Sequence, residues 1–319
     1  VRTGTATSAV VLGNGINSGS DKAVLVVLNM DNGNVIREID TSAYGGPTTN
    51  NGLFAPTGIY AADGKTLVYA YAGDLQGNVW KFDLTANAPG SWSAKKIFHA
   101  EKTAGTPQPI TGGIASAVDP RTNKRWVFFG TGSFLTSADA NDIGTNKQSV
   151  YGVIDDITTG SAYTRSSLTQ RSVTAVGDER YFQDLVNLTT KGWYLDLPDK
   201  GERMVLDAQV DGSYLQFNTM MPSGNSCADA SGSGYINAIT PFSDMAASTK
   251  SNFDLDGIGG TDDAGTGGKP TGSVKTSGIP TLSLLLPGEG RYGTADGVRK
   301  YGKGIPEWNR VSWREMRED

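Results

Sequence analysis

The stretch LVYAYAGDLQGNVWKFDL, at residues 67–84, decides the fold of this chain. It consists of an apolar run that ends in Gly-Asp (Leu67–Asp74) and a second apolar run after a glycine (residues 77–84). A third run, WSAKKIF at residues 92–98, follows a Pro-Gly turn. Short runs rich in Val, Tyr, Trp and Phe between turn residues are typical of β-strands. The stretch therefore predicts a small antiparallel sheet.

The same plan recurs along the chain, which makes this sheet one unit of a repeat. The glycines that end the first strand of each unit, Gly13, Gly73 and Gly130, are spaced 60 and 57 residues apart. In the first unit, Asp-Asn-Gly within residues 29–34 separates two apolar runs and predicts a hairpin turn. The other units, of which the last is fainter, are AVVLGNG (9–15) with residues 23–40, RWVFFGTG (125–132) with SVYGVIDDITTG (149–160), and YLQFNTMMP (214–222) with GYINAITP (234–241).

Such units predict an all-β fold of the β-propeller type. Each sheet alone is too thin to bury both faces, so several must stack around an axis. Four units would make a small propeller, and we expect a partial set of blades, with further blades supplied upstream of Val1. A β-sandwich with irregular loops stays open as the alternative. We expect the blades to occupy residues 1–242, and residues 243–319 to form a Gly/Ser/Thr/Asp-rich insert of long loops with a C-terminal tail.

Composition supports this fold and excludes several functions. The chain has 42 glycines, 28 aromatic residues (6 Trp, 12 Tyr and 10 Phe) and only 19% charged residues, as expected for many short strands and turns. The net charge of −5, without a basic cluster before the C-terminus, argues against nucleic-acid binding. No stretch reaches the roughly 18 apolar residues of a transmembrane helix. With one His and one Cys, the usual zinc-enzyme ligand set is excluded.

Several phrases, in order along nearly the whole chain, resemble the C-terminal domain of the PilC/PilY proteins of type IV pili. The most recognisable is YAYAGDLQGNVWKFDL at residues 69–84. The others are LGNGINS (12–18), FGTGSFL (129–135), QSVYGVIDD (148–156), GWYLDLPDKGERMV (192–205), the Cys before a Gly-rich turn (227–234) and RVSWRE (310–315).

The resemblance implies a non-enzymatic role and a location. It implies a secreted protein that crosses the periplasm and reaches the outer membrane, cell surface or pilus tip. There it would support pilus assembly, oppose retraction and so affect twitching motility, and mediate adhesion. The implied partners are minor pilins of the tip complex and a host or abiotic surface. The domain would be a modified propeller that binds calcium in some members.

The first calcium site of such relatives is expected just before the YAGD strand. Calcium takes about six to eight oxygen ligands, usually from alternating Asp and Asn side chains. Counted back from Tyr71, the expected ligand positions are Tyr60, Ala62, Gly64 and Val68, and none is a carboxylate. We therefore expect Asp63-Gly64 to form only a hairpin turn.

A second calcium loop is predicted in NFDLDGIGGTDD, residues 252–263. One register uses Asp254, Asp256 and Asp262, with Ile258 where a further Asp is expected. The other uses Asn252, Asp254, Asp256 and Asp263, with Ile258 donating its carbonyl. A solvated acidic turn stays open as the alternative. The candidate ligands are therefore Asn252, Asp254, Asp256, Ile258, Asp262 and Asp263.

Other chemistry-bearing residues favour structural interpretations. The sequence has no G-x-S-x-G phrase that would supply a nucleophile for His99, so we expect His99 to lie at a strand end. Cys227 would pair with an upstream cysteine or be a buried thiol. Asp139, Asn141 and Asp142 would form a solvated turn, with an ion or glycan contact as the alternative. We expect Trp80, Trp126, Trp193 and Tyr151 to pack between blades, and Trp308 and Trp313 to hold the tail on the body.

Two other functions remain alternatives to the pilus hypothesis. Phrases such as GNVWKFD (77–83) also occur in quinoprotein dehydrogenase propellers, which would need a quinone pocket with calcium and a catalytic Asp. Absorption after reconstitution with pyrroloquinoline quinone would detect that cofactor. A carbohydrate-binding propeller is the third hypothesis, which a glycan array would test.

Overall fold

The computed structural model describes residues 1–103, 105–142, 147–157, 160–211, 214–223, 232–244, 253–254, 271–286, 289–294 and 297–303. Nearly all of the secondary structure in these ranges is β-strand. None of the helices found there is long and apolar enough to span a bilayer.

The first sheet is the predicted first unit. Its antiparallel strands are, in spatial order, β1 (Ala9–Gly13), β2 (Val24–Asn29) and β3 (Val35–Asp40). The predicted hairpin joins β2 to β3: the Asn29 amide donates to the carbonyl of Asn34 (2.8 Å), and Gly33 has a φ of 72°, which a residue with a side chain rarely adopts. The short helix η1 (Thr41–Tyr44) follows β3.

The second sheet contains the stretch that decides the fold, now as β5, β6 and β7. Two strands that the sequence did not reveal, β4 and β13, complete it. In spatial order the strands are β13 (Tyr163–Thr164), β7 (Ser93–His99), β6 (Asn78–Asp83), β5 (Leu67–Gly73) and β4 (Thr57–Tyr60), with η2 (Pro89–Ser91) between β6 and β7. A small hairpin, β8 (Glu101–Thr103) and β9 (Thr106–Pro107), follows β7.

The third sheet contains the predicted pair as β11 and β12. In spatial order its strands are β10 (Ala115–Asp119), β11 (Lys124–Gly130), β12 (Ser149–Ile154), β17 (Gly192–Asp196) and β14 (Thr169–Gln170). The helix α1 (Ser137–Asn141) lies between β11 and β12, and η3 (Arg165–Ser167) precedes β14.

The fourth and fifth sheets contain the C-terminal strands. The fourth is ordered β15 (Val173–Val176), β16 (Glu179–Phe182), β22 (Ser273–Thr276), β20 (Gly232–Ile239), β19 (Tyr214–Pro222), β18 (Gln209–Asp211). The fifth is ordered β21 (Phe253–Asp254), β25 (Gly297–Lys303), β24 (Glu289–Thr294), β23 (Leu284–Leu286). The predicted fourth unit is confirmed as the β19–β20 pair.

The expectation of long loops over residues 243–288 is wrong in part, because β22 and β23 lie there. The buried side chains of Ser273 and Thr276 are small and polar, so the segment lacks the apolar run that predicts a strand. The proposed boundary between residues 242 and 243 stays a prediction. Strand β22 lies after this boundary and pairs with β16 and β20, which lie before it.

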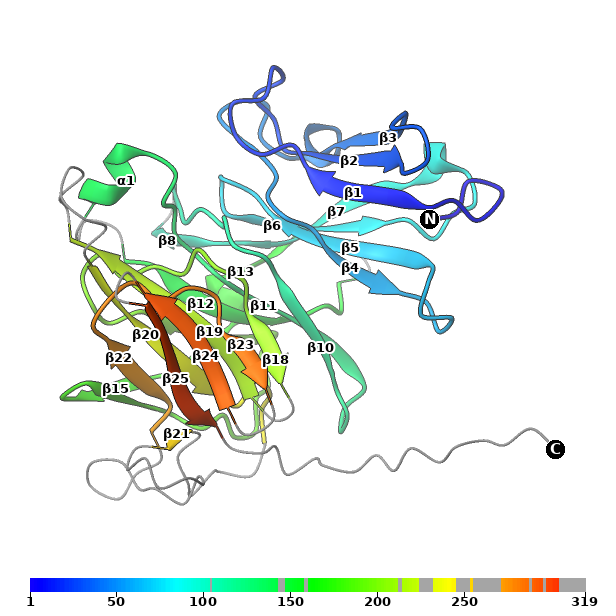
Figure 1. Cartoon of the computed structure of the whole chain (residues 1–319). Helices are drawn as coiled ribbons and strands as arrows, with labels where there is room; N and C mark the ends of the chain where they lie inside the picture. The colour runs from blue at the N-terminus through cyan, green and yellow to red at the C-terminus, as the bar shows by residue number, and fades with distance from the viewer. Residues whose placement is uncertain are drawn as a thin grey trace.

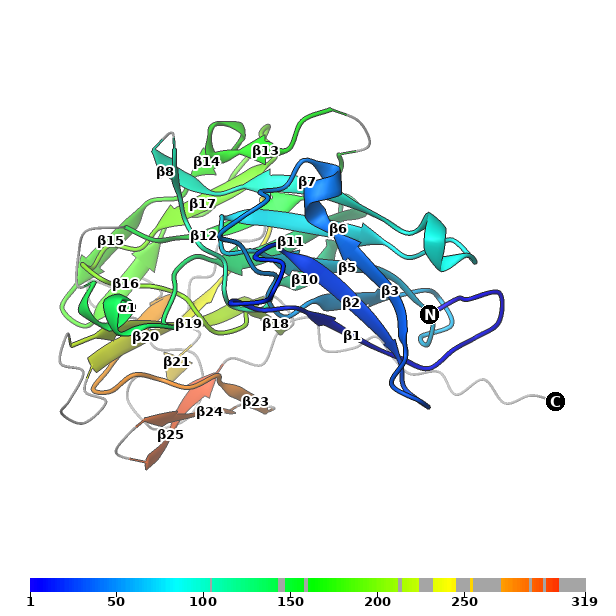
Figure 2. The same cartoon turned by 90° about the horizontal axis from the view of Figure 1, so that it is seen from above.

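The first four sheets stack in an open arc, with the N-terminal sheet at one end (Figures 1 and 2). One hydrophobic cluster lies between the first and second sheets, another between the second and third, and another between the third and fourth. A smaller cluster joins the fourth sheet to the fifth. This is the arrangement of propeller blades, and it confirms the predicted modified propeller with a partial set of blades.

Aromatic side chains fill the spaces between blades, as predicted. Trp80 is buried between the first two blades, Tyr151 between the second and third, and Trp126 and Trp193 between the third and fourth. The ring of Phe98, on the second blade, lies 5.0 Å from that of Tyr151. Burial of such a side chain contributes about 1.5–3 kcal/mol, so these contacts determine how neighbouring blades sit.

The anchor glycines mark where the chain leading to the next blade crosses closely. A Cβ atom at Gly13 would lie 2.3 Å from the carbonyl oxygen of Leu53. One at Gly130 would lie 2.3 Å from the side chain of Met204. A residue with a Cβ atom would clash at either position, so glycine is required where these segments cross.

Candidate functional site

The predicted calcium loop falls almost wholly outside the described residues. Of its candidate ligands, only Asp254 is described, and only through its backbone, which pairs with Gly302 as part of β21. The other candidates, Asn252, Asp256, Ile258, Asp262 and Asp263, lie outside the described ranges, as do Cys227, Trp308 and Trp313. Across the part of the chain that the structure describes, no three His, Cys, Asp or Glu side chains gather in a way that could hold a metal.

Asp63-Gly64 is the hairpin turn between β4 and β5, as predicted. The Asp63 carboxylate accepts hydrogen bonds from the amides of Lys65 and Thr66, both at 2.8 Å, and from the Thr66 hydroxyl at 2.5 Å. These hydroxyl and backbone hydrogen bonds lower the pKa of Asp63 to about 2. The carboxylate therefore stabilises a turn.

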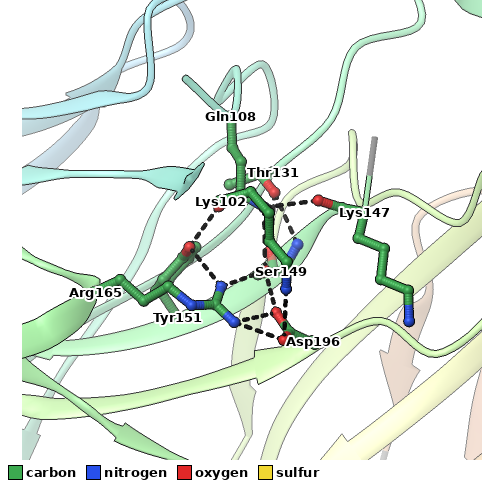
Figure 3. Close-up of polar contacts among 8 residues, drawn as sticks. All are labelled: Lys102, Gln108, Thr131, Lys147, Ser149, Tyr151, Arg165 and Asp196. Carbon is green, nitrogen blue, oxygen red and sulfur yellow. Dashed lines mark hydrogen bonds and ion pairs between the residues drawn. The ribbon is translucent and has the colours of Figure 1, made fainter. Parts of the chain in front are cut away.

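The richest polar cluster among the described residues lies where the β8–β9 hairpin meets the third blade (Figure 3). We call it the Asp196 cluster. Its members come from β8, β12, β17, η3 and the connecting segments, and they are Lys102, Gln108, Thr131, Lys147, Ser149, Tyr151, Arg165 and Asp196. Residues that are hydrogen-bonded in this cluster lie up to 94 positions apart in the sequence, so residue spacing alone could not have predicted the cluster.

Asp196, the last residue of β17, is the centre of the cluster. The Arg165 guanidinium reaches its two carboxylate oxygens at 2.6 and 2.5 Å. The Lys102 ammonium donates to one oxygen at 2.8 Å, and the Ser149 hydroxyl donates to the other at 2.8 Å. Arg165 also stacks on Tyr194, 3.8 Å from its ring centre. One guanidinium nitrogen makes both contacts to the carboxylate, and charge-assisted hydrogen bonds of this kind are among the stronger ones in proteins.

A second branch extends the cluster into the core. Tyr151 donates to the side-chain oxygen of Gln108 at 2.5 Å. Gln108 in turn donates to the Lys147 carbonyl at 2.9 Å and to Ser149 at 3.1 Å. The amide of Ser149 donates to the Thr131 hydroxyl at 2.9 Å. Gln108 follows the β8–β9 hairpin of the second blade, so this branch also joins two blades.

The electrostatics favour permanently charged partners. Burial alone would raise the pKa of Asp196, but hydrogen bonds from Arg165, Lys102 and Ser149 outweigh it and leave the pKa below its ordinary value. Burial lowers the pKa of Arg165, whereas its hydrogen bond to Asp196 raises it. The net effect is a pKa above the ordinary value of arginine. Ser149 donates to a carboxylate that is fully engaged with cations, so its hydroxyl has no general base. The arrangement can clamp two blades together.

An open cavity of about 420 Å³ is lined by the β8–β9 hairpin and by residues of the second blade. His99 ends β7 there, as predicted, with its Nδ1 atom 2.9 Å from the Asn78 side-chain oxygen and its Nε2 atom 3.9 Å from Glu101. Burial lowers the pKa of His99, which favours the neutral form of its ring. The cavity is also lined by Lys96 and Gln76, which suits a small polar group.

The acidic segment after the third blade's anchor strand is a short helix instead of the predicted turn. Its Thr136 and Asp139 form a reciprocal capping box at the start of α1. One oxygen of Asp139 accepts from the amides of Leu135 (2.8 Å) and Thr136 (2.9 Å), while Asn141 donates to the Ser137 carbonyl at 2.8 Å. These hydrogen bonds give Asp139 and Asn141 a structural role in the helix. Asp142 is the C-cap residue that follows the helix.

Comparison with known proteins finds a family and several relatives. The family model described as the PilY1 beta-propeller domain matches residues 1–183. A type IV pilus biogenesis factor PilY1 homolog of Xylella fastidiosa is 33% identical over 99% of this chain and 26% of its own length. The type IV pilus biogenesis factor PilY1 of Pseudomonas aeruginosa is 30% identical over 73% of this chain and 24% of its own length.

A solved structure agrees with the sequence matches. The crystal structure of the Pseudomonas aeruginosa PilY1 C-terminal domain superposes with a TM-score of 0.76 at 25% identity, covering 96% of this chain and 71% of that one. The present chain spans about a quarter of the length of the curated relatives it matches.

Proposed function

The chain belongs to the PilY1 β-propeller family, and from this we propose that it is a non-enzymatic module of type IV pilus biogenesis. The observation that carries the proposal is the joint match in sequence and fold, since the relatives are named as pilus biogenesis factors. These names favour the pilus hypothesis over a quinoprotein dehydrogenase or a carbohydrate-binding propeller.

The geometry supports binding through a rigid surface. In the Asp196 cluster the charged groups are engaged with each other, and the Ser149 hydroxyl has no base to activate it. The third blade is thereby fixed against the hairpin that follows the second. A stack of blades fixed in this way can present its connecting loops in a constant arrangement, which is what an assembly module requires.

We propose finer features of this role from the family resemblance. The domain would be secreted through the periplasm, act at the outer membrane, cell surface or pilus tip, contact minor pilins, oppose retraction and contribute to adhesion to host or abiotic surfaces. Calcium bound by residues 252–263 would stabilise the C-terminal region. Support for the calcium loop comes from its alternating carboxylate and amide oxygens.

Deletion of the domain from a piliated host strain tests the proposal. We expect surface pili to disappear, and to return when pilus retraction is also disabled. The matched control is Glu289→Ala, which removes only an exposed ion pair with Arg291 and should leave piliation unchanged. Normal piliation in the deletion strain would contradict the proposed function.

A further inference from the structure

Three buried polar side chains form one row across the sheet of the fourth blade. They belong to Arg180 of β16, Ser273 of β22 and Asn237 of β20. Arg180 is paired with Ser273, and Ser273 is paired with Asn237. Paired residues on neighbouring antiparallel strands point their side chains to the same face of the sheet. The three polar groups therefore lie side by side, and each side chain is at most 1% exposed.

The row faces the third blade. Ile236 and Ala238, the neighbours of Asn237, belong to the hydrophobic cluster between the fourth and fifth sheets. Ile239, two residues beyond Asn237, belongs to the cluster between the third and fourth blades. Because side chains alternate between the two faces of a strand, Asn237 and the residues paired with it point toward the third blade. The row is thus enclosed between two blades and out of reach of bulk solvent.

Each member of the row keeps one buried polar atom that no protein group within the described ranges satisfies. These atoms are Nε of Arg180, Oγ of Ser273 and Oδ1 of Asn237. The other guanidinium nitrogens of Arg180 bond to Glu202. The Nδ2 atom of Asn237 donates to the carbonyls of Phe217 (3.2 Å) and Tyr235 (3.3 Å), which identifies Oδ1 as the remaining atom. Buried polar atoms of folded proteins almost always have a partner, so the row calls for one more group.

The chemistry of the three atoms selects that group. The Nε atom of Arg180 can only donate, Oδ1 of Asn237 can only accept, and the Ser273 hydroxyl can do either. An anion would be repelled by Oδ1 and by the adjacent Glu202 carboxylate, and a cation would be repelled by Arg180. Paired residues on neighbouring strands have Cβ atoms about 4.5–5.5 Å apart, which leaves room for a small group only. A neutral molecule that both donates and accepts fits these requirements.

We propose that one buried water molecule, the β22 water, binds to Arg180, Ser273 and Asn237 as a fixed part of the fourth blade. It would accept a hydrogen bond from Nε of Arg180 and donate one to Oδ1 of Asn237. Its remaining hydrogen bond would be made with the Ser273 hydroxyl. Buried water molecules typically make about three hydrogen bonds to groups that are otherwise unsatisfied, which is the number available here.

The position of the β22 water gives it a role in joining strands. The β16–β22 ladder has only two residue pairs, Glu179 with Val274 and Arg180 with Ser273, whereas the β20–β22 ladder has four. A water that bridges Arg180, Ser273 and Asn237 would connect all three strands through their side chains. It would therefore reinforce the shortest ladder of this sheet. The inference concerns the interior of the blade and does not depend on the pilus role.

A crystal structure of the domain, at a resolution that shows ordered water, tests the proposal directly. We expect one isolated density peak about 2.7–3.2 Å from each of the three atoms, Nε of Arg180, Oγ of Ser273 and Oδ1 of Asn237. The peak should refine as water. In crystals of Ser273→Ala it should be weaker, because one of its three hydrogen bonds is lost.

Urea unfolding of Ser273→Ala supplies a second test, in which the sign of the change decides. If the hydroxyl bonds to the β22 water, its removal should lower the folding equilibrium constant about fivefold. If the hydroxyl has no partner, its removal should leave the constant unchanged or raise it, because a buried unsatisfied group is lost. Lys275→Ala, at an exposed position of the same strand, is the control and should change the constant by no more than about twofold.

The proposal would be overturned by any of three results. One is a parent crystal structure in which the three side chains bond directly to one another or to other protein groups, with no density peak between them. Another is a peak whose contacts and refined density identify an ion. The third is a Ser273→Ala variant that is as stable as the parent or more stable. If this variant does not fold, the parent crystal structure alone decides.

Discussion

Arg180 and Glu202 form a bidentate ion pair inside the fourth blade, with hydrogen bonds of 2.7 and 2.8 Å and almost no solvent exposure of either side chain. Glu202 also accepts from the Thr219 hydroxyl at 2.6 Å, and the Arg180 guanidinium lies 3.3 Å from the ring centre of Tyr235. The pair therefore joins β16, β19 and β20 to the segment that leads from the third blade.

We predict that Glu202→Ala lowers the free energy of unfolding by about 3–5 kcal/mol, because it removes the buried bidentate partner of Arg180 and leaves its charge only the more exposed Asp199, at 3.2 Å. Urea unfolding followed by tryptophan fluorescence would measure it. Glu289→Ala is the matched control: its partner Arg291 is half exposed, and such surface pairs contribute about 0–1 kcal/mol. Equal effects of the two substitutions would contradict this view of the buried pair.

A second prediction concerns the anchor glycine of the first blade. Gly13→Ala should lower the unfolding free energy by about 1–3 kcal/mol, because the new Cβ would lie 2.3 Å from the Leu53 carbonyl oxygen and 2.4 Å from that of Phe54. Backbone atoms cannot rotate away as a side chain can. Thermal unfolding would measure the loss. Gly19→Ala meets no atom within 4 Å and should have little effect; a similar loss there would argue against a steric cause.

The parts of the fold that could be predicted from sequence are those with local apolar patterns. The strands in Leu67–Asp74 and Arg125–Gly132 are rich in Val, Tyr and Phe and end at glycine, and both are found as β5 and β11. Strands such as β4, TGIY at Thr57–Tyr60, are too short and mixed to stand out. The two-residue β13 depends on pairing with β7, across more than 60 residues, and has no sequence signal of its own.

The Asp196 cluster illustrates why sites built from distant residues escape sequence reasoning. The phrase GWYLDLPDKGERMV (192–205) stands out in the sequence only through its family resemblance, yet it supplies Asp196 and Glu202. Arg165 and Lys102, the partners of Asp196, come from η3 and β8. A carboxylate inside an apolar strand phrase was the available signal, because a buried charge requires a partner.

Calcium binding by residues 252–263 is a third prediction. Isothermal titration of the domain with calcium should give saturable heat, which the double variant Asp254→Ala/Asp256→Ala should lose, because both registers of the loop use these carboxylates. Asp31→Ala, in the exposed hairpin between β2 and β3, is the control and should titrate like the parent. An absence of saturable heat in the parent would refute the predicted site.

The last prediction is the pH dependence of the Asp196 cluster. The pKa of Asp196 is lower in the folded protein than in the unfolded chain, where it is about 3.9. The stabilisation is therefore complete above about pH 4 and is lost as the pH falls through the folded pKa. Asp196→Asn should cost about 1–3 kcal/mol near neutral pH.

Urea unfolding from about pH 7 down to about pH 3 would show whether the free-energy difference between parent and Asp196→Asn shrinks below about pH 4. Asp31→Asn, at an exposed turn where no Lys or Arg within the described ranges forms an ion pair with the carboxylate, should run parallel to the parent throughout. If the Asp196→Asn difference stayed constant over the whole range, the carboxylate charge would not be what joins the third blade to the hairpin that carries Lys102.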